Sequence, residues 1–324
     1  MRLVALLLLL LGSPAFADSP LAAMEWLVGG QWESKTEVAP GYALETRTTV
    51  AFGPGKWSMR MRQYVKAKQG EYQQYETFFW VDPKQPRIQY ITFHTQGAAV
   101  RGTGEIKDGV MTLHQAAVNP YPEMRLVFRP NAENRDQYRG EIFYKKGAAW
   151  DKVKSADSTR TKLSEPPKLK PPERRGKLEL LAKFAGDFRY FEKSSNKLLG
   201  RHFHRFSLHG RLLVGWDYEQ KGDKEVPGSM SVIWSDPISR KIESISVFAT
   251  GAVTTAIVQA EGEGLTWDVT DTPREGTPVR SRVAVAWIES NTYEMQMLTQ
   301  EDGKWKLTDF VAVGRRQKPT KRPR

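Results

Sequence analysis

The chain has 324 residues, of which 40% are hydrophobic and 11% are aromatic, and it contains no cysteine. This length and composition can supply two ordinary folded domains, which excludes a globally disordered chain, and the lack of cysteine excludes disulfides, thiolate metal sites and cysteine nucleophiles. The net charge of +12 is concentrated in two segments, with a net +4 in residues 161–177 and a net +6 in residues 315–324. Charge placed in this way acts as a diffuse anion tether, which argues against a shaped nucleic-acid groove.

The amino-terminal segment has the pattern of a secretory signal peptide. Arg2 precedes an apolar run at residues 3–11, and Ala15 and Ala17 stand where a signal peptidase requires small side chains. The apolar run is too short to span a bilayer. We therefore predict a signal peptide at 1–17, cleavage after Ala17, and a periplasmic or extracellular location.

The rest of the sequence repeats itself at a nearly constant offset. Trp80 recurs as Trp234, 154 residues later, and Tyr138 recurs as Tyr293, 155 residues later. A constant offset over about 130 residues indicates a duplication, because chance matches would scatter. The predicted organisation is a first domain at 18–160, a linker rich in proline and lysine at 161–177, a second domain at 178–314 and a disordered basic tail at 315–324.

Within each copy a short helical opening precedes many strand patterns. Residues 20–27 and 178–184 carry apolar side chains at helical spacing, so each copy is predicted to open with one or two helical turns. The following strands are separated by turn signals, among them Asp82-Pro83 and Asp236-Pro237, which we interpret as turns and not as paired catalytic carboxylates. Antiparallel strands without long helices indicate an all-β sandwich or up-and-down barrel.

A family resemblance narrows this choice. The sequence Gly30-Gln31-Trp32 on the first strand, with Arg160 late in the copy, resembles the lipocalin and fatty-acid-binding (calycin) superfamily. The second copy has Gly186-Asp187-Phe188, followed late by Arg315 or Arg316. It also resembles a bacterial lipocalin-like family of unknown function, in three stretches: residues 204–214, Ile233-Trp234-Ser235-Asp236-Pro237 and Asp302-Gly303-Lys304-Trp305.

The resemblance implies two tandem lipocalin-like antiparallel β-barrels, each opened by a short helix. In a closed barrel the first and last strands are neighbours, so an arginine late in the copy can lie across the aromatic ring of the first strand. We predict such structural contacts between Trp32 and Arg160, and between Phe188 and Arg315 or Arg316. The phenylalanine is a departure from the family pattern, which has tryptophan at this position.

Two histidines form the most distinctive polar pattern. His202 and His204 point the same way on a strand, together with Phe206. Two imidazoles on one face suit zinc or a haem iron, but a catalytic zinc needs three protein ligands, and no Asp or Glu completes the short run. The alternative interpretation is a pair of packed barrel histidines. We predict no metal ion, no cofactor and no catalytic residue.

The predicted function is non-enzymatic binding of a small, mainly apolar ligand in one or both barrels. Two alternatives remain: an envelope interaction or structural module with filled barrels, and a lyase-type or isomerase-type enzyme that uses His202 and His204. The basic segments 161–177 and 315–324 are predicted to make weak contacts with anionic envelope surfaces. No specific nucleic-acid partner and no transmembrane segment are predicted. The candidate ligand-binding residues are His202, His204, Phe206, Ile91, Phe93, Ile245 and Val247.

Overall fold

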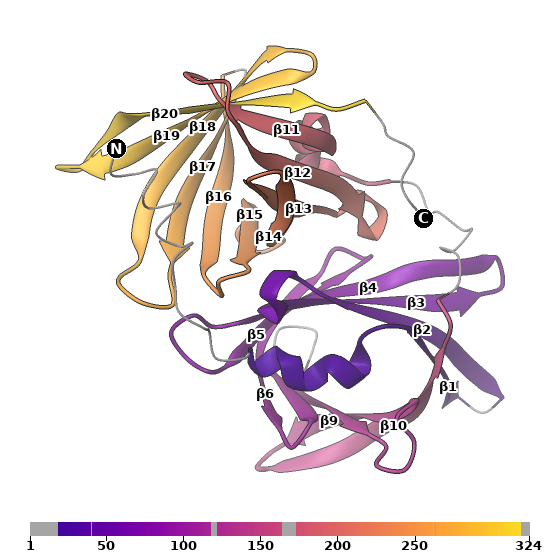
Figure 1. Ribbon diagram of the computed structural model, residues 1–324. Coiled ribbons are helices and arrows are strands. Elements are labelled where there is room, and N and C mark those ends of the chain that lie inside the picture. Colours follow the sequence, from indigo (N-terminus) through magenta and orange to yellow (C-terminus); the bar gives the residue numbers. More distant parts are fainter. Residues whose placement is uncertain (1–18, 40, 118–121, 164–172, 263, 319–324) are drawn as a thin grey trace. The chain divides into compact units, whose positions relative to one another are not determined.

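The computed structural model describes residues 19–39, 41–117, 122–163, 173–262 and 264–318. These residues form two compact units, and the chain passes from the first to the second between residues 173 and 174. The predicted signal peptide, most of the predicted linker and residues 319–324 lie outside the described residues. Each unit is a closed antiparallel β-barrel in which consecutive strands are neighbours and the last strand pairs with the first (Figure 1). The predicted all-β class and the tandem barrels are confirmed.

The first unit contains η1 (Pro20–Leu27), β1 (Gln31–Ala39), β2 (Tyr42–Phe52), η2 (Pro54–Lys56), β3 (Ser58–Ala67), β4 (Gly70–Val81), β5 (Ile88–His94), β6 (Ala99–Lys107), β7 (Val110–Gln115), β8 (Met124–Pro130), β9 (Gln137–Lys146) and β10 (Ala149–Thr161).

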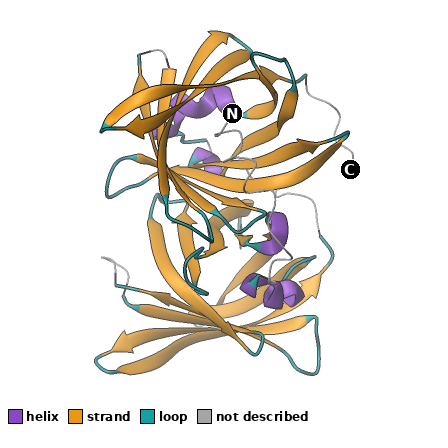
Figure 2. Cartoon of the chain, turned by 60° about the vertical axis from the view of Figure 1, so that its left-hand side comes forward, coloured by secondary structure: helices purple, strands orange, loops and turns teal. Residues whose placement is uncertain are grey.

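The second unit contains η3 (Gly176–Phe184), β11 (Gly186–Glu192), β12 (Leu198–Ser207), η4 (Leu208–Gly210), β13 (Leu212–Lys221), β14 (Lys224–Ser235), β15 (Ile242–Phe248), β16 (Val253–Glu261), β17 (Gly264–Thr272), β18 (Val279–Glu289), β19 (Thr292–Glu301) and β20 (Lys304–Arg316). Figure 2 shows how small the helical share is beside the strands.

The two opening helices are 3₁₀ helices. Their buried residues are spaced three apart, which is the period of a 3₁₀ helix and gives one apolar stripe along its length. Ser19 caps η1, because its side chain accepts a hydrogen bond from the backbone amide of Leu21 at 3.2 Å. Each stripe packs as part of a barrel core. The stripes consist of Leu21, Met24 and Leu27 in η1 and of Leu178, Leu181 and Phe184 in η3.

An arginine joins the opening helix to the first and last strands of the first barrel. Arg160 on β10 pairs in register with Trp32 on β1, and its guanidinium lies 4.7 Å from the indole ring. The same guanidinium donates hydrogen bonds to the carbonyl oxygens of Trp26 and Val28, at the end of η1. Gly30 provides the space, since a Cβ there would lie 3.1 Å from Cγ of Arg160. The predicted contact between Trp32 and Arg160 is confirmed.

The second barrel repeats this arrangement with Arg316. Its guanidinium lies 4.5 Å from the ring of Phe188 and donates hydrogen bonds to the carbonyl oxygens of Lys183 and Ala185. Arg315 instead stacks on Phe191, at 4.8 Å, because adjacent residues of a strand point to opposite faces. Of the two predicted arginines, Arg316 is therefore the structural equivalent of Arg160, and the role given to Arg315 is corrected.

Two predicted boundaries also change. Strand β10 continues to Thr161, and β20 continues to Arg316, two residues beyond the predicted end of the second domain at 314. The amide of Gln317 still donates to the carbonyl oxygen of Asp187, at 2.8 Å. The first residues of the predicted tail are therefore part of the barrel wall.

The two Asp-Pro sequences form turns, as predicted. A side-chain oxygen of Asp82 accepts hydrogen bonds from the backbone amides two and three residues later, at 2.8 and 3.2 Å. The oxygen of Asp236 does the same at 2.9 and 2.7 Å. Each carboxylate is committed to its own turn, so the two are not a catalytic pair.

Candidate functional site

The interior of the second barrel is identified by its apolar core. This core contains the buried stripe of η3 together with Phe188, Leu213, Ile233, Ile242, Val258, Leu265, Val285 and Tyr293. Because side chains alternate across a strand, residues an even number of positions from these core residues share the inner face, where no bulge intervenes. This rule, combined with the strand register, shows which side chains line the barrel beyond the core.

The predicted histidines lie on this inner face. His202 and His204 on β12 pair in register with Asp217 and Gly215 on β13, and both partners share the inner face with Leu213. His202 is buried, with 8% of its surface exposed, and its ring lies 4.9 Å from that of His204. The structure therefore brings the two histidines together beside a carboxylate.

Glycines in the barrel wall make room for three of the interior rings. Each glycine faces a ring so closely that a Cβ would approach a side-chain atom to less than 3.0 Å. The rings therefore lie against the wall instead of projecting across the barrel. The pairs are Gly200 with Tyr190, Gly215 with His204, and Gly314 with Tyr293.

His202 is a neutral, hydrogen-bonded histidine. The hydroxyl of Tyr293 lies 3.1 Å from its Nε2 and 3.2 Å from its Nδ1, so it bonds to one ring nitrogen at a time. Burial lowers the pKa of His202 well below its usual value, and the nearby charges of His204 and Arg316 lower it further. At neutral pH the ring therefore acts as a polar group and not as a cation.

His204 and Asp217 form a coupled pair. Burial lowers the pKa of His204 while the charge of Asp217 opposes this shift, and burial raises the pKa of Asp217 while His204 and the Ser229 hydroxyl oppose it. Ser229 donates to a carboxylate oxygen of Asp217 at 2.7 Å. Nδ1 of His204 is buried and has no hydrogen-bond partner among the described residues. A buried polar atom of this kind needs an explanation, because leaving it unpaired costs about 1–3 kcal/mol.

Small polar side chains line the neighbouring wall. Ser229 and Ser231 on β14 face inward with Ile233, and Ser244 and Ser246 on β15 face inward with Ile242. At the matching positions of the first barrel, Ser229 corresponds to Tyr75 and Ser244 to Tyr90. Two large rings of the first copy are thus replaced by serines in the second. We call His202, His204, Asp217, Ser229, Tyr190 and Tyr293 the interior polar cluster.

Four candidate residues lie elsewhere. Ile245 and Val247 are an odd number of positions from Ile242, and Ile91 and Phe93 match them in the first barrel. All four therefore lie on the outer face of the strands, away from the interior, and the assumption that they line the barrel is corrected. Phe206 faces inward, but it packs against the apolar core and carries the guanidinium of Arg175 over its ring, at 4.5 Å.

Sequence reasoning missed most of the cluster. Asp217, Ser229 and Tyr293 reach the histidines from three other strands, and only strand register places them there. A signal was nevertheless available, because the copies align at an offset of 154 and the serine-for-tyrosine replacements can be read from that alignment. Among the described residues, no group of three or more His, Asp or Glu side chains is arranged to hold a metal ion.

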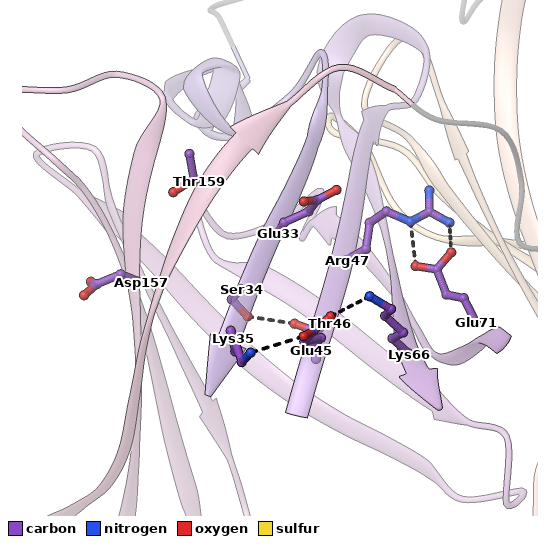
Figure 3. A pocket seen from close by; sticks show the side chains of 10 residues that line it. All are labelled: Glu33, Ser34, Lys35, Glu45, Thr46, Arg47, Lys66, Glu71, Asp157 and Thr159. Atoms are coloured by element: carbon purple, nitrogen blue, oxygen red, sulfur yellow. Dashed lines mark hydrogen bonds and ion pairs between the residues drawn. The ribbon is translucent and has the colours of Figure 1, made fainter. Parts of the chain in front are cut away.

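The first barrel has a cavity of about 370 Å³ in its wall, shown in Figure 3. Five of its charged side chains pair with one another. Arg47 makes two hydrogen bonds to Glu71, at 2.6 and 2.7 Å, and Glu45 pairs with Lys66 at 2.9 Å and Lys35 at 3.4 Å. A ligand would have to displace these ion pairs, and the lining is not suited to an apolar ligand. The lining residues are Glu33, Ser34, Lys35, Glu45, Thr46, Arg47, Lys66, Glu71, Asp157 and Thr159.

The chain is a tandem β-barrel protein with a polar cluster inside its second barrel. No known family model and no curated protein matches its sequence. Among solved structures it is similar to a protein of unknown function from the DUF3598 family of Nostoc punctiforme, with 11% identity, a TM-score of 0.25, and coverage of 93% of this chain and 100% of that chain.

Two further similar structures are of transferrin binding protein B. A mutant from Haemophilus parasuis is 9% identical, with a TM-score of 0.21 and coverage of 90% of this chain and 76% of that chain. The isotype 1 protein from serogroup B Neisseria meningitidis is 8% identical, with a TM-score of 0.20 and coverage of 89% and 76%. These values are too low to carry an argument, so the site is interpreted from its own geometry.

Proposed function

We propose that this chain is an exported, non-enzymatic protein that binds a small ligand inside its second barrel. Export rests on the predicted signal peptide. The observation that carries the binding site is the buried, unpartnered Nδ1 of His204 beside Asp217, in a part of the barrel lined by serines. A ligand with a polar group would satisfy these atoms while its apolar part lies against the barrel core. The sequence alone predicts a mainly apolar ligand, and the polar atoms of the site lead us to propose an amphipathic ligand instead.

The two copies supply the test of this proposal. In the first barrel Tyr90 lies over Gly102, and the matching pair in the second barrel is Ser244 and Ala256. The double variant Ser244→Tyr/Ala256→Gly recreates the first-copy pair and places a ring inside the second barrel. We expect native mass spectrometry of the purified mature protein to show a retained small molecule, and the double variant to lose it while keeping its thermal stability.

Two control variants accompany this experiment. Ala256→Gly alone adds no ring to the interior, and Thr255→Tyr adds the same ring on the exposed outer face of β16. Both should retain the molecule. Retention by the double variant, or absence of any bound molecule from every preparation, would count against the second barrel as the site.

An acid–base enzyme remains the second candidate, because His204 faces inward beside Asp217 with their two pKa values shifted toward each other. This arrangement suits proton transfer in a lyase or isomerase. The two functions differ in what happens to the bound molecule. Incubation of the loaded protein in deuterium oxide leaves a merely bound ligand without deuterium on carbon, whereas proton abstraction at carbon introduces it.

Contacts with anionic surfaces are proposed for the basic segments. Residues 318–324 contain four of the positive charges of the predicted tail, and all four lie beyond β20. A chain that ends at Gln317 should bind anionic vesicles less well at low salt while keeping its stability, because Arg316 is retained. At 0.15 M salt, binding of the full chain should already be weak. Anion binding that resists both truncation and salt would place the interaction on a barrel surface.

Among the described residues, no helix has the length and apolar character needed to cross a membrane.

A further inference from the structure

We propose that the second barrel selects ligands that carry a cationic amine over neutral or anionic molecules of the same size. This inference rests on the proposed binding function and adds the charge class of the ligand. Three features of the inner face support it. Two carboxylates are partly buried, the histidines are neutral, and the guanidinium of Arg316 already binds two backbone carbonyl oxygens.

The carboxylates have few partners of their own. Asp217 accepts a hydrogen bond from Ser229, and Asp271 on β17 accepts one from Thr254. The register places Asp271 on the inner face, because it pairs with Thr254 and lies six positions from the core residue Leu265. Burial raises the pKa of both carboxyl groups, which means that each lacks a fully compensating positive charge.

The positive groups near the interior do not neutralise these carboxylates. Among the described strand residues of this barrel that face inward and are at least partly buried, the only lysine or arginine is Arg316. Its guanidinium is held over Phe188 by two carbonyl oxygens at the end of η3. Exposed Lys221, on the same face at the end of β13, pairs with Glu219 at 3.7 Å.

The polar atoms left open match an ammonium group. An alkylammonium has three donors and no acceptor. The buried Nδ1 of His204 accepts a donor in one of its two neutral tautomers, and the second carboxylate oxygen of Asp217 accepts another. A carboxylate ligand would instead meet Asp217 with like charge, and an alcohol would supply a single donor.

Calorimetric titration of the mature full-length protein tests this preference with n-hexylamine, 1-hexanol and hexanoate at pH 7.5. We expect hexylamine to bind at least tenfold more tightly than hexanol, and hexanoate to bind most weakly. Asp217→Asn should abolish most of the amine preference, because it should lower hexylamine affinity by at least tenfold more than it lowers hexanol affinity. The matched control is Asp268→Asn, since Asp268 pairs with Arg282 at 2.6 Å on the outer face. That control should leave all three affinities unchanged.

Two further measurements keep the test decisive. Amine binding should persist at 0.5 M salt, because a buried attraction is screened less than a surface one. If Asp217→Asn does not fold, Asp271→Asn should show a smaller loss in the same direction. Hexanol or hexanoate binding as tightly as hexylamine overturns the cation preference but leaves the binding site standing. Binding that is unchanged in Ser244→Tyr/Ala256→Gly, or binding by none of the three probes, overturns the site itself.

Discussion

Gly314→Ala is expected to destabilise the second barrel by about 3 kcal/mol, at the upper end of the usual range for overpacking a core. A Cβ at this position would approach the ring of Tyr293 to less than 3.0 Å, in a part of the wall where both residues are buried. The ring cannot simply rotate away, because its hydroxyl bonds to His202 and the ring also contacts Phe188 and Trp287. Peptide-level hydrogen exchange should show faster opening across β18 to β20.

A glycine without such a ring provides the control for this prediction. Gly228 is also buried, but a Cβ there would meet the flexible side chain of Glu219, at 3.1 Å, and no ring, so Gly228→Ala should change stability little. The double variant Gly314→Ala/Tyr293→Ala should be less destabilised than the sum of the two single variants, because removing the ring relieves the overlap. Additive effects would show that the ring is not what Gly314 accommodates.

The repeat and the strand pattern were sufficient to predict the fold. Trp80 and Trp234 lie at matching positions of β4 and β14, and the late arginines close both barrels. The sequence could not choose between Arg315 and Arg316, because adjacent residues differ only in the face they occupy. That choice depends on the register with β11, where Phe188 pairs with Arg316.

The candidate site was predicted only in part, for a physical reason. The alternation of side chains along a strand shows that His202 and His204 share a face. It does not show which face of the strand points into the barrel. On β4 and β5 both faces carry large apolar residues, such as Phe78 and Phe79, so hydrophobicity does not distinguish the inside from the outside. Ile91 and Phe93 are therefore reasonable ligand-binding candidates from the sequence, although the register places them on the outer face. The contacts that define the cluster cross several strands, and they exist only once the register is known.

The two copies share one framework and differ in what their interiors hold. Trp32 and Phe188 occupy the same place, as do Tyr138 and Tyr293, because these residues support barrel closure. The second copy has Asp217 where the first has Gln63, and it has His202 where the first has Thr48, each at an offset of 154. The second copy therefore has a carboxylate and a histidine where the first has neutral side chains, which supports a role specific to the second barrel.

Acidification below pH 6.5 should destabilise the second barrel through His202. Its pKa in the folded barrel lies well below the usual value of 6.5, so below that pH the unfolded chain binds a proton that the folded barrel does not. Stability is then complete above pH 6.5 and falls by about 1.4 kcal/mol per pH unit for one such histidine. The loss grows as the pH falls toward the pKa of His202 in the folded barrel, and the lowered pKa of His204 adds to it.

The carboxylates act in the opposite direction at lower pH. The raised pKa values of Asp217 and Asp271 mean that the folded barrel takes up those protons before the unfolded chain does, which stabilises it toward pH 4 and offsets the loss. Urea unfolding between pH 7.5 and 5, followed by hydrogen exchange in peptides of β11 to β20, measures the slope. His202→Gln should reduce the slope of unfolding free energy against pH by about 1.4 kcal/mol per pH unit, the contribution of one proton. His114→Gln, at an exposed position of the first unit, should leave the slope unchanged. If the slope survives His202→Gln in full, the acid sensitivity arises elsewhere in the chain, and the neutral state assigned to His202 is wrong.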